Sequence, residues 1–163
     1  MNLKRLLSVF LLVALVIMTT ACGSKTNTET SSVSPTTLAD DMLKALNAQG
    51  ELIEVSSNVV SNYYELDADV VNEYKIYIST SFIAEEVAVF KIAKKSDADK
   101  VKSMIEKRIL DLKETFTGYL PEELDTLEQN ATILTNGDIV AFVTGTKEGV
   151  AAATEVFNNA FEK

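Results

Sequence analysis

The chain has 163 residues, with 24 acidic and 15 basic side chains, one cysteine and no histidine, a length that suits one domain with a hydrophobic core. The net charge of −9 disfavours binding to nucleic acid or to anionic lipid headgroups. Without histidine, the chain lacks the commonest general base and zinc ligand, so any chemistry would depend on carboxylates, lysine, tyrosine or an oxygen-bound cation.

The first 22 residues have the pattern of an export signal. Lys4 and Arg5 precede an apolar block of thirteen residues, 6–18, whereas a membrane-spanning helix needs about 20. The small residue Ala21 stands before the single cysteine, Cys22. This segment resembles the signal of bacterial lipoproteins, in which the cysteine receives a diacylglyceryl thioether and becomes the new N-terminus. The alternative is an ordinary signal followed by a free, buried cysteine.

The lipoprotein resemblance implies that residues 1–21 are removed and that acyl chains on Cys22 hold the protein on the outer face of the cell membrane. The remaining 142 residues carry a net charge of −11, so membrane binding would come from the lipid rather than from basic side chains. Two acyl chains, at about 0.8 kcal/mol per buried methylene, make a stable anchor. Residues 23–37 are mostly Ser, Thr, Asn and Lys, which predicts a flexible tether before a domain at 38–163.

The domain is expected to begin with two helices. Residues 38–49 have helical periodicity, with Thr37 as N-cap and Gly50 as the end. Residues 55–66 also show apolar side chains at helical spacing, although their valines and tyrosines suit a strand equally well. We expect a helix there.

Two strands should follow a turn at 67–73. Apolar and polar residues alternate over 74–82, which predicts a strand. Residues 87–93 are apolar on both faces, as in the central strand of a sheet.

A long amphipathic helix comes next, with Ser96 as its N-cap and Gly118 at its end. Its apolar residues step by 4, 4, 3 and 4 along one face: Val101, Ile105, Ile109, Leu112 and Phe116. Pro121 begins a short segment whose acids suit a helix N-terminus.

The sharpest local signal is a hairpin. Asn136 and Gly137 lie between two β-rich runs, and a two-residue turn there would set Leu134 opposite Ile139. Residues 147–161 predict a final helix with an apolar stripe made of Val150, Ala153, Phe157 and Phe161. The element order predicts an α+β fold: a four-stranded, mainly antiparallel sheet covered on one face by helices, in a single domain.

Four stretches together resemble a known family: Leu66-Asp67 with Val70-Val71 and Glu73-Tyr74, then 84–91, Arg108, and 116–123 from Phe116 to Glu123. The set is similar to the family catalogued as domain of unknown function 4358, small lipoproteins mostly of Gram-positive Firmicutes. The similarity covers about residues 38–161 and agrees with the lipoprotein prediction. It implies no reaction, ligand or catalytic residue.

Arg108 is the only arginine beyond the expected signal, and it borders the apolar stripe of the long helix. Its guanidinium could bind a ligand carboxylate or phosphate bidentately. It could equally pair with an acid such as Glu85 while its stem covers the core, which is the interpretation that we favour. Tyr119 and the other tyrosines could line a groove for sugar or peptide, or lie at the edge of the core.

Acidic residues suggest two further hypotheses. Four acids suggest a calcium site: Glu65, Asp67, Asp69 and Glu73, of which the first three have the spacing of an EF-hand start. However, Val70 occupies the position that needs glycine and Ile76 the one that needs glutamate, so an EF-hand is excluded and only a looser cation site remains open. Acids that could form a glycosidase pair are Glu85-Glu86, Glu122-Glu123 and Asp125, although chance proximity is expected among 24 acids.

These observations predict a non-catalytic, extracytoplasmic lipoprotein of the cell envelope that needs no cofactor and no metal. Its expected contacts are the membrane, through lipid on Cys22, and a protein partner or small ligand, but not nucleic acid. Two alternatives remain: a carboxylate-based cell-wall or glycan hydrolase, and a small-ligand-binding protein that uses Arg108.

Overall fold

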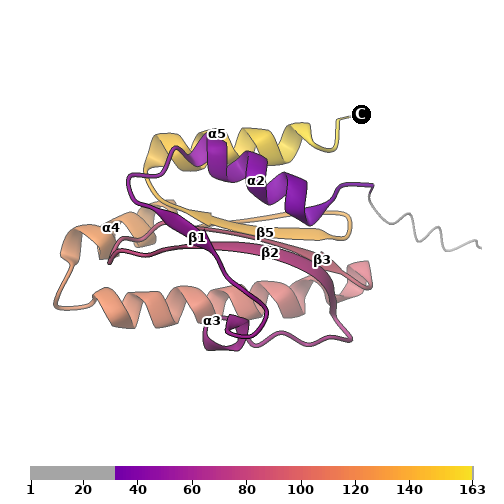
Figure 1. Cartoon of the computed structure of the whole chain (residues 1–163), viewed down its shortest axis with the longest axis horizontal. Coiled ribbons are helices and arrows are strands. Elements are labelled where there is room, and N and C mark those ends of the chain that lie inside the picture. The colour runs from indigo at the N-terminus through magenta and orange to yellow at the C-terminus, as the bar shows by residue number, and fades with distance from the viewer. Residues whose placement is uncertain (1–31, 163) are drawn as a thin grey trace, which may run out of the picture.

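The computed structural model describes residues 32–162 (Figure 1). The expected signal at 1–21, Cys22 and most of the expected tether lie outside the described residues. The described part is one α+β domain in three layers, with a five-stranded antiparallel sheet in the middle. Helices α2 and α5 cover one face, and α3 and α4 cover the other. Within 32–162, no helix has the length and apolar character needed to cross a bilayer.

The strands are β1 Leu52–Glu54, β2 Val71–Ser79, β3 Glu86–Ile92, β4 Thr132–Asn136 and β5 Ile139–Thr144. Their order in the sheet is β1-β2-β3-β5-β4, and every neighbouring pair is antiparallel. The expectation of four strands omitted the short β1. The expectation of helices on one face only was also wrong, because β3 and β5 are apolar on both faces and both faces must be covered.

The helices are α2 Pro35–Leu46, α3 Ala98–Phe116, α4 Pro121–Asn130 and α5 Lys147–Asn159. Helix α2 begins earlier than expected because Pro35 takes its first turn, where a missing N–H is tolerated. Helix α3 is preceded by a 3₁₀ turn, η2 Lys95–Asp97, so Asp97 rather than Ser96 stands at its N-cap.

The helix expected over 55–66 is wrong. The chain there continues from β1 into a loop with one 3₁₀ turn, η1 Val60–Asn62. Val55, Val60 and Tyr64 are all buried against the sheet. A loop that follows the sheet surface buries these side chains, and this packing outweighs the helical spacing in the sequence.

The β4–β5 hairpin turns at Gly137 and Asp138, one residue later than expected. Gly137 has φ +61° and Asp138 has no positive φ, as in a type II′ turn with glycine first. Leu134 is therefore opposite Ala141 and not Ile139. Because the pairing moves by two residues, every side chain keeps its expected face of the sheet.

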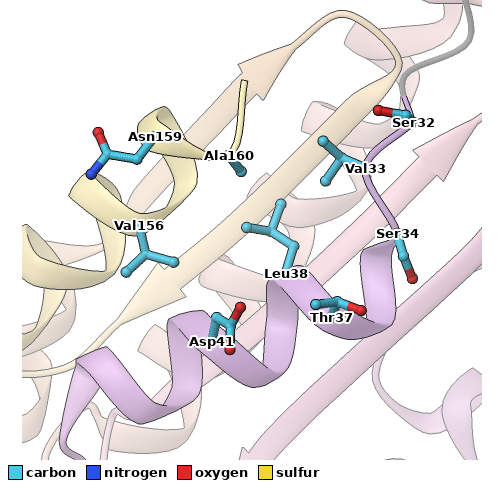
Figure 2. Close-up of a pocket in the computed structure, with 9 residues that line it drawn as sticks. All are labelled: Ser32, Val33, Ser34, Thr37, Leu38, Asp41, Val156, Asn159 and Ala160. Atoms are coloured by element: carbon cyan, nitrogen blue, oxygen red, sulfur yellow. The ribbon is translucent and has the colours of Figure 1, made fainter. Parts of the chain in front are cut away.

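The α2/α5 face holds an apolar core, with the buried carboxylate of Glu85 at the end of α2. Its buried residues are Leu38, Ala39, Met42, Leu46, Val87, Val89, Ile139, Ala141, Val143, Val150, Ala153 and Phe157. The two helices approach closely at Gly149, where an added Cβ would lie 2.3 Å from the backbone oxygen of Leu46. Farther along, the start of α2 and the end of α5 separate into a groove of about 560 Å³, onto which Leu38 and Val156 face (Figure 2).

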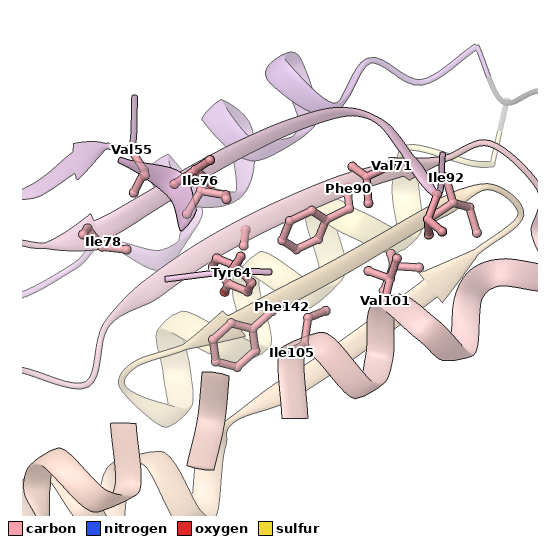
Figure 3. Packing of buried hydrophobic residues seen from close by; sticks show 14 residues of the cluster. Val55, Tyr64, Val71, Ile76, Ile78, Phe90, Ile92, Val101, Ile105 and Phe142 are labelled. Atoms are coloured by element: carbon pink, nitrogen blue, oxygen red, sulfur yellow. The ribbon is translucent and has the colours of Figure 1, made fainter. Parts of the chain in front are cut away.

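The α3 face holds the larger core. Figure 3 shows Val101 and Ile105 of α3 packed beneath the sheet residues Phe90 and Phe142, with Tyr64 beside them. A smaller cluster of Ala84, Phe116 and Leu127 joins the end of α3 to α4 and to the β2–β3 loop. The expected apolar stripe of α3 is thus confirmed as its inner face.

Candidate functional site: a buried ion pair beneath the β2–β3 loop

Arg108 of α3 forms an ion pair with Glu86 at the start of β3. Its Nη2 donates to Oε2 of Glu86 at 2.8 Å and its Nε donates to the same oxygen at 3.1 Å. The two side chains are only 13% and 3% exposed. Arg108 therefore pairs with an acid, as favoured from the sequence, but the acid is Glu86 and not Glu85.

Two tyrosines complete this cluster. The Tyr64 hydroxyl donates to Oε1 of Glu86 at 2.5 Å, and its ring meets Phe90 edge-on at 5.2 Å between centroids. The Tyr63 ring covers the Arg108 guanidinium at 5.2 Å, a cation–π contact. We call Tyr63, Tyr64, Glu86 and Arg108 the ion-pair cluster.

The protonation states in the cluster are fixed by its surroundings. Burial raises the pKa of the Tyr64 hydroxyl well above its ordinary value, and the charge of Glu86 adds to that rise. Burial alone would lower the pKa of Arg108, but the attraction of Glu86 outweighs it and the net pKa is raised. Tyr64 is therefore a neutral donor and Arg108 a cation, and both donate hydrogen bonds to Glu86.

A cavity of about 210 Å³ lies beside the ion-pair cluster, between the β2–β3 loop (80–85) and the last turns of α3. We call it the hairpin pocket. Apolar side chains form much of its wall, and both members of the ion pair, Arg108 and Glu86, also line it. Phe82, 79% exposed, lies in the loop that borders the pocket.

Of the other acids proposed as a glycosidase pair, Glu85 and Glu123 bind backbone groups, whereas Glu122 and Asp125 are exposed on α4. Both carboxylate oxygens of Glu85 accept the N–H of Gln49, at 2.9 and 3.0 Å, and one also accepts the N–H of Gly50 at 3.0 Å. Glu123, in the first turn of α4, accepts the N–H of Ala84 at 2.7 Å. These carboxylates fasten the connection after α2 and the β2–β3 loop.

Tyr119 is not brought to Arg108. It lies in the α3–α4 connection, is 85% exposed and is not among the residues that line the hairpin pocket. Phe82 was missed by the sequence reasoning, which placed it inside a strand. The signal that could have found it is a large apolar residue directly after Ser79, Thr80 and Ser81, a polar run typical of a turn.

The acids of the rejected calcium loop form a turn. The Asp67 carboxylate accepts the N–H of Asp69 at 2.9 Å, and the Asp67 carbonyl accepts the N–H groups of Val70 and Val71. Among residues 32–162, three or more acidic, cysteine or histidine side chains nowhere gather closely enough to hold a metal ion.

The fold and the site define a three-layer α+β domain with a buried ion pair under a loop that exposes an aromatic side chain. Residues 44–145 match the family described as "Domain of unknown function (DUF4358)", more than half of the chain, so the protein belongs to this family. The matched span contains the whole ion-pair cluster and the hairpin pocket and ends before α5. Comparison with curated proteins and with solved structures gives no match.

Proposed function

We propose that the protein is a lipid-anchored, extracytoplasmic component of the cell envelope whose domain is a non-catalytic binding module. Acylated Cys22 would hold it on the outer face of the cell membrane. The observation that carries the binding role is the pair of exposed aromatic side chains at one end of the domain, Phe82 at 79% and Tyr119 at 85% exposure.

The two aromatic residues share an end that we call the distal end, formed by residues 47–51, 80–85 and 117–120. The bond from Ala84 to Glu123 ties the β2–β3 loop to the start of α4 there. Helix α2 begins, and α5 finishes, at the opposite end of the domain (Figure 1). A chain anchored through Cys22 enters the domain by α2, so the distal end would point away from the bilayer.

The hydrogen bonds of the candidate acids support binding rather than catalysis. Glu85, Glu86 and Glu123 each accept bonds that hold the fold together. A general acid or base has to be free to exchange its proton with a substrate. Large exposed aromatic side chains, by contrast, are enriched where proteins bind their partners.

Photocrosslinking in intact membranes tests the proposal. p-Benzoylphenylalanine would replace Phe82 or Tyr119 in the full-length chain, with Leu110, 55% exposed on α3, as the matched control. We expect adducts with another envelope component at the first two positions and none at Leu110. Equal adducts at all three positions, or none at the distal end, would contradict a distal binding surface.

The anchor has a separate test. The full-length chain should incorporate labelled palmitate and appear in the membrane fraction, and Cys22→Ser should lose both properties. A secreted protein that keeps residues 1–21 and an unmodified Cys22 in mass spectrometry would end the lipoprotein proposal.

A further inference from the structure

We propose that the distal end binds a segment of a partner protein that presents lysine or arginine beside a large apolar side chain, with the apolar side chain entering the hairpin pocket. This inference rests on the proposed function and names the chemistry of its partner. It follows from three observations: the charge around Phe82, the size of the pocket, and the hydrogen bonds that the acids lining the pocket already accept from the protein itself.

The surface of the distal end and of the adjoining parts of α3 and α4 is acidic. In residues 47–51, 80–85 and 112–126, the exposed charged side chains are all acids: Glu51, Glu114, Glu122 and Asp125. The single base in these segments, Lys113, is half-buried and lies 3.7 Å from Glu128. A second base, Lys147, is exposed at the start of α5 beside this end, followed by the exposed acid Glu148, so acids still outnumber bases. Charge complementarity therefore favours a basic partner and disfavours anionic lipid, nucleic acid and a second copy of this acidic chain.

The hairpin pocket is too small for a typical small-molecule ligand. Its volume is about 210 Å³, whereas sites for drug-sized ligands occupy about 300–1,000 Å³. Ile78, Leu112 and Phe116 contribute apolar wall, and Phe82 stands at the mouth. One large apolar side chain of a partner suits a space of this size and lining.

The basic group of the partner would remain outside the pocket. Inside it, Glu86 already accepts bonds from Arg108 and Tyr64, and Glu85 accepts bonds from the backbone after α2. A cation entering the pocket would also face the guanidinium of Arg108. The exposed acids Glu122 and Asp125 on the neighbouring helix α4 are thus the proposed partners for lysine or arginine outside the pocket.

The probe is a display library of random short peptides. It would be selected on the full-length lipidated chain in neutral phosphatidylcholine nanodiscs and counter-selected on a Phe82→Ala/Tyr119→Ala variant. We expect enriched peptides with lysine or arginine beside an aromatic or large aliphatic residue. Their Kd should rise at least about tenfold in Phe82→Ala, as for an anchor residue of an interface.

The charge contribution is measured on the same peptides. Glu122→Gln/Asp125→Gln should raise the Kd several-fold, and added salt should weaken binding to the wild type more than to this variant. The matched controls, Glu155→Gln on α5 and Leu110→Ala on α3, should leave the Kd unchanged. Phe82→Ala should keep the wild-type urea midpoint, because its side chain is exposed.

Peptides without basic residues, or binding unaffected by Glu122→Gln/Asp125→Gln, would overturn the proposed partner chemistry. No enrichment over the counter-selected variant would also overturn it. Both failures leave the crosslinking test of the binding module intact, so the two proposals can fail separately.

Discussion

The two faces of the sheet are covered by cores that differ in their side chains. The core under α2 and α5 consists of apolar side chains, and its helices meet at a glycine. The core over α3 contains a buried carboxylate, its guanidinium partner and a tyrosine hydroxyl, with a cavity beside them. The same strands, β3 and β5, contribute to both cores.

The ion-pair cluster on the α3 face is better explained by positioning than by a gain in stability. A buried ion pair is weak evidence for stability, because apolar residues of similar volume often serve as well. The ion-pair cluster instead fixes the start of β3 relative to α3, next to the loop that carries Phe82. Both cores hold the fold together, and the α3 face in addition positions the candidate binding surface.

The largest effect should come from breaking the ion pair. Arg108→Met leaves Glu86 as a buried, unpaired charge, so the free energy of unfolding should fall by about 3–5 kcal/mol in urea denaturation. Lys107→Met is the matched control: its side chain is 55% exposed and its ammonium pairs with Asp111, so the loss should stay below about 1 kcal/mol.

A fully apolar replacement sharpens this test. The triple variant Arg108→Met/Glu86→Leu/Tyr64→Phe should recover most of the lost stability, because it leaves no buried polar group without a partner. A small loss in Arg108→Met alone would mean that Glu86 does not depend on the guanidinium.

The next largest loss of stability is expected on the α2/α5 face. In Gly149→Ala, the new Cβ would meet the Leu46 backbone oxygen at 2.3 Å, and the helices must separate. Although alanine gains about 1 kcal/mol in helix propensity, the overpacking should leave a net loss of about 1–3 kcal/mol. Thermal denaturation would measure it, and a rise in Tm would contradict the close helix contact.

Gly118→Ala provides the comparison for Gly149→Ala. Its Cβ would meet no atom within 4 Å, but its φ is +80°. The free energy of unfolding of Gly118→Ala should therefore fall by the backbone strain alone, about 1–2 kcal/mol.

Alkaline pH should weaken the α3 face. The pKa of Tyr64 is raised in the folded state by burial and then by Glu86, so above pH about 10 the unfolded chain loses a proton that the folded chain keeps. Stability should therefore fall as pH rises, by up to about 1.4 kcal/mol per pH unit for this group. Urea denaturation from pH 9 to about 11.5 should show a shallower slope in Tyr64→Phe.

Tyr77→Phe serves as the control for that slope. The pKa of Tyr77 is also raised, first by burial and then by its hydrogen bond to Asp40, but it belongs to the other face. If Tyr77→Phe removes more of the slope than Tyr64→Phe does, the alkaline sensitivity lies on the α2 side of the sheet.

The smallest expected effect is a gain in stability. Among the described residues, the buried hydroxyl of Thr144 has no hydrogen-bond partner, so Thr144→Val should raise the free energy of unfolding by about 1 kcal/mol. Thr146→Val should lower it by a similar amount, because the Thr146 hydroxyl accepts the N–H of Gly149 at the start of α5. Urea denaturation of the two variants should give opposite signs.

Much of the fold could be predicted from local patterns. The apolar stripe of α3 and the alternation in β2 placed their inner faces correctly, because burial alone decides such positions. Residues 55–66 could not be predicted in this way. Their structure depends on Tyr64 reaching Glu86, a contact between segments 22 residues apart.

Only part of the candidate site could be predicted from the sequence. Arg108 stood out as a lone arginine beside an apolar stripe, but its partner within the Glu85-Glu86 pair depends on strand phase. Glu86 shares its face of β3 with Ala88 and Phe90, and extending that alternation back by one step would have identified it. The hairpin pocket and the exposure of Phe82 require the packed helix and loop, which no local pattern contains.

Helix α2, the first element of the domain, packs on α5, the last, and the central strand β3 pairs with β5 about 50 positions later. These contacts between distant parts of the chain set the order of folding. An emerging polypeptide cannot close its first core until residue 157 is available, because Phe157 packs in that core. During synthesis from the N-terminus, the core under α2 and α5 therefore stays open until the residues around Phe157 have been added.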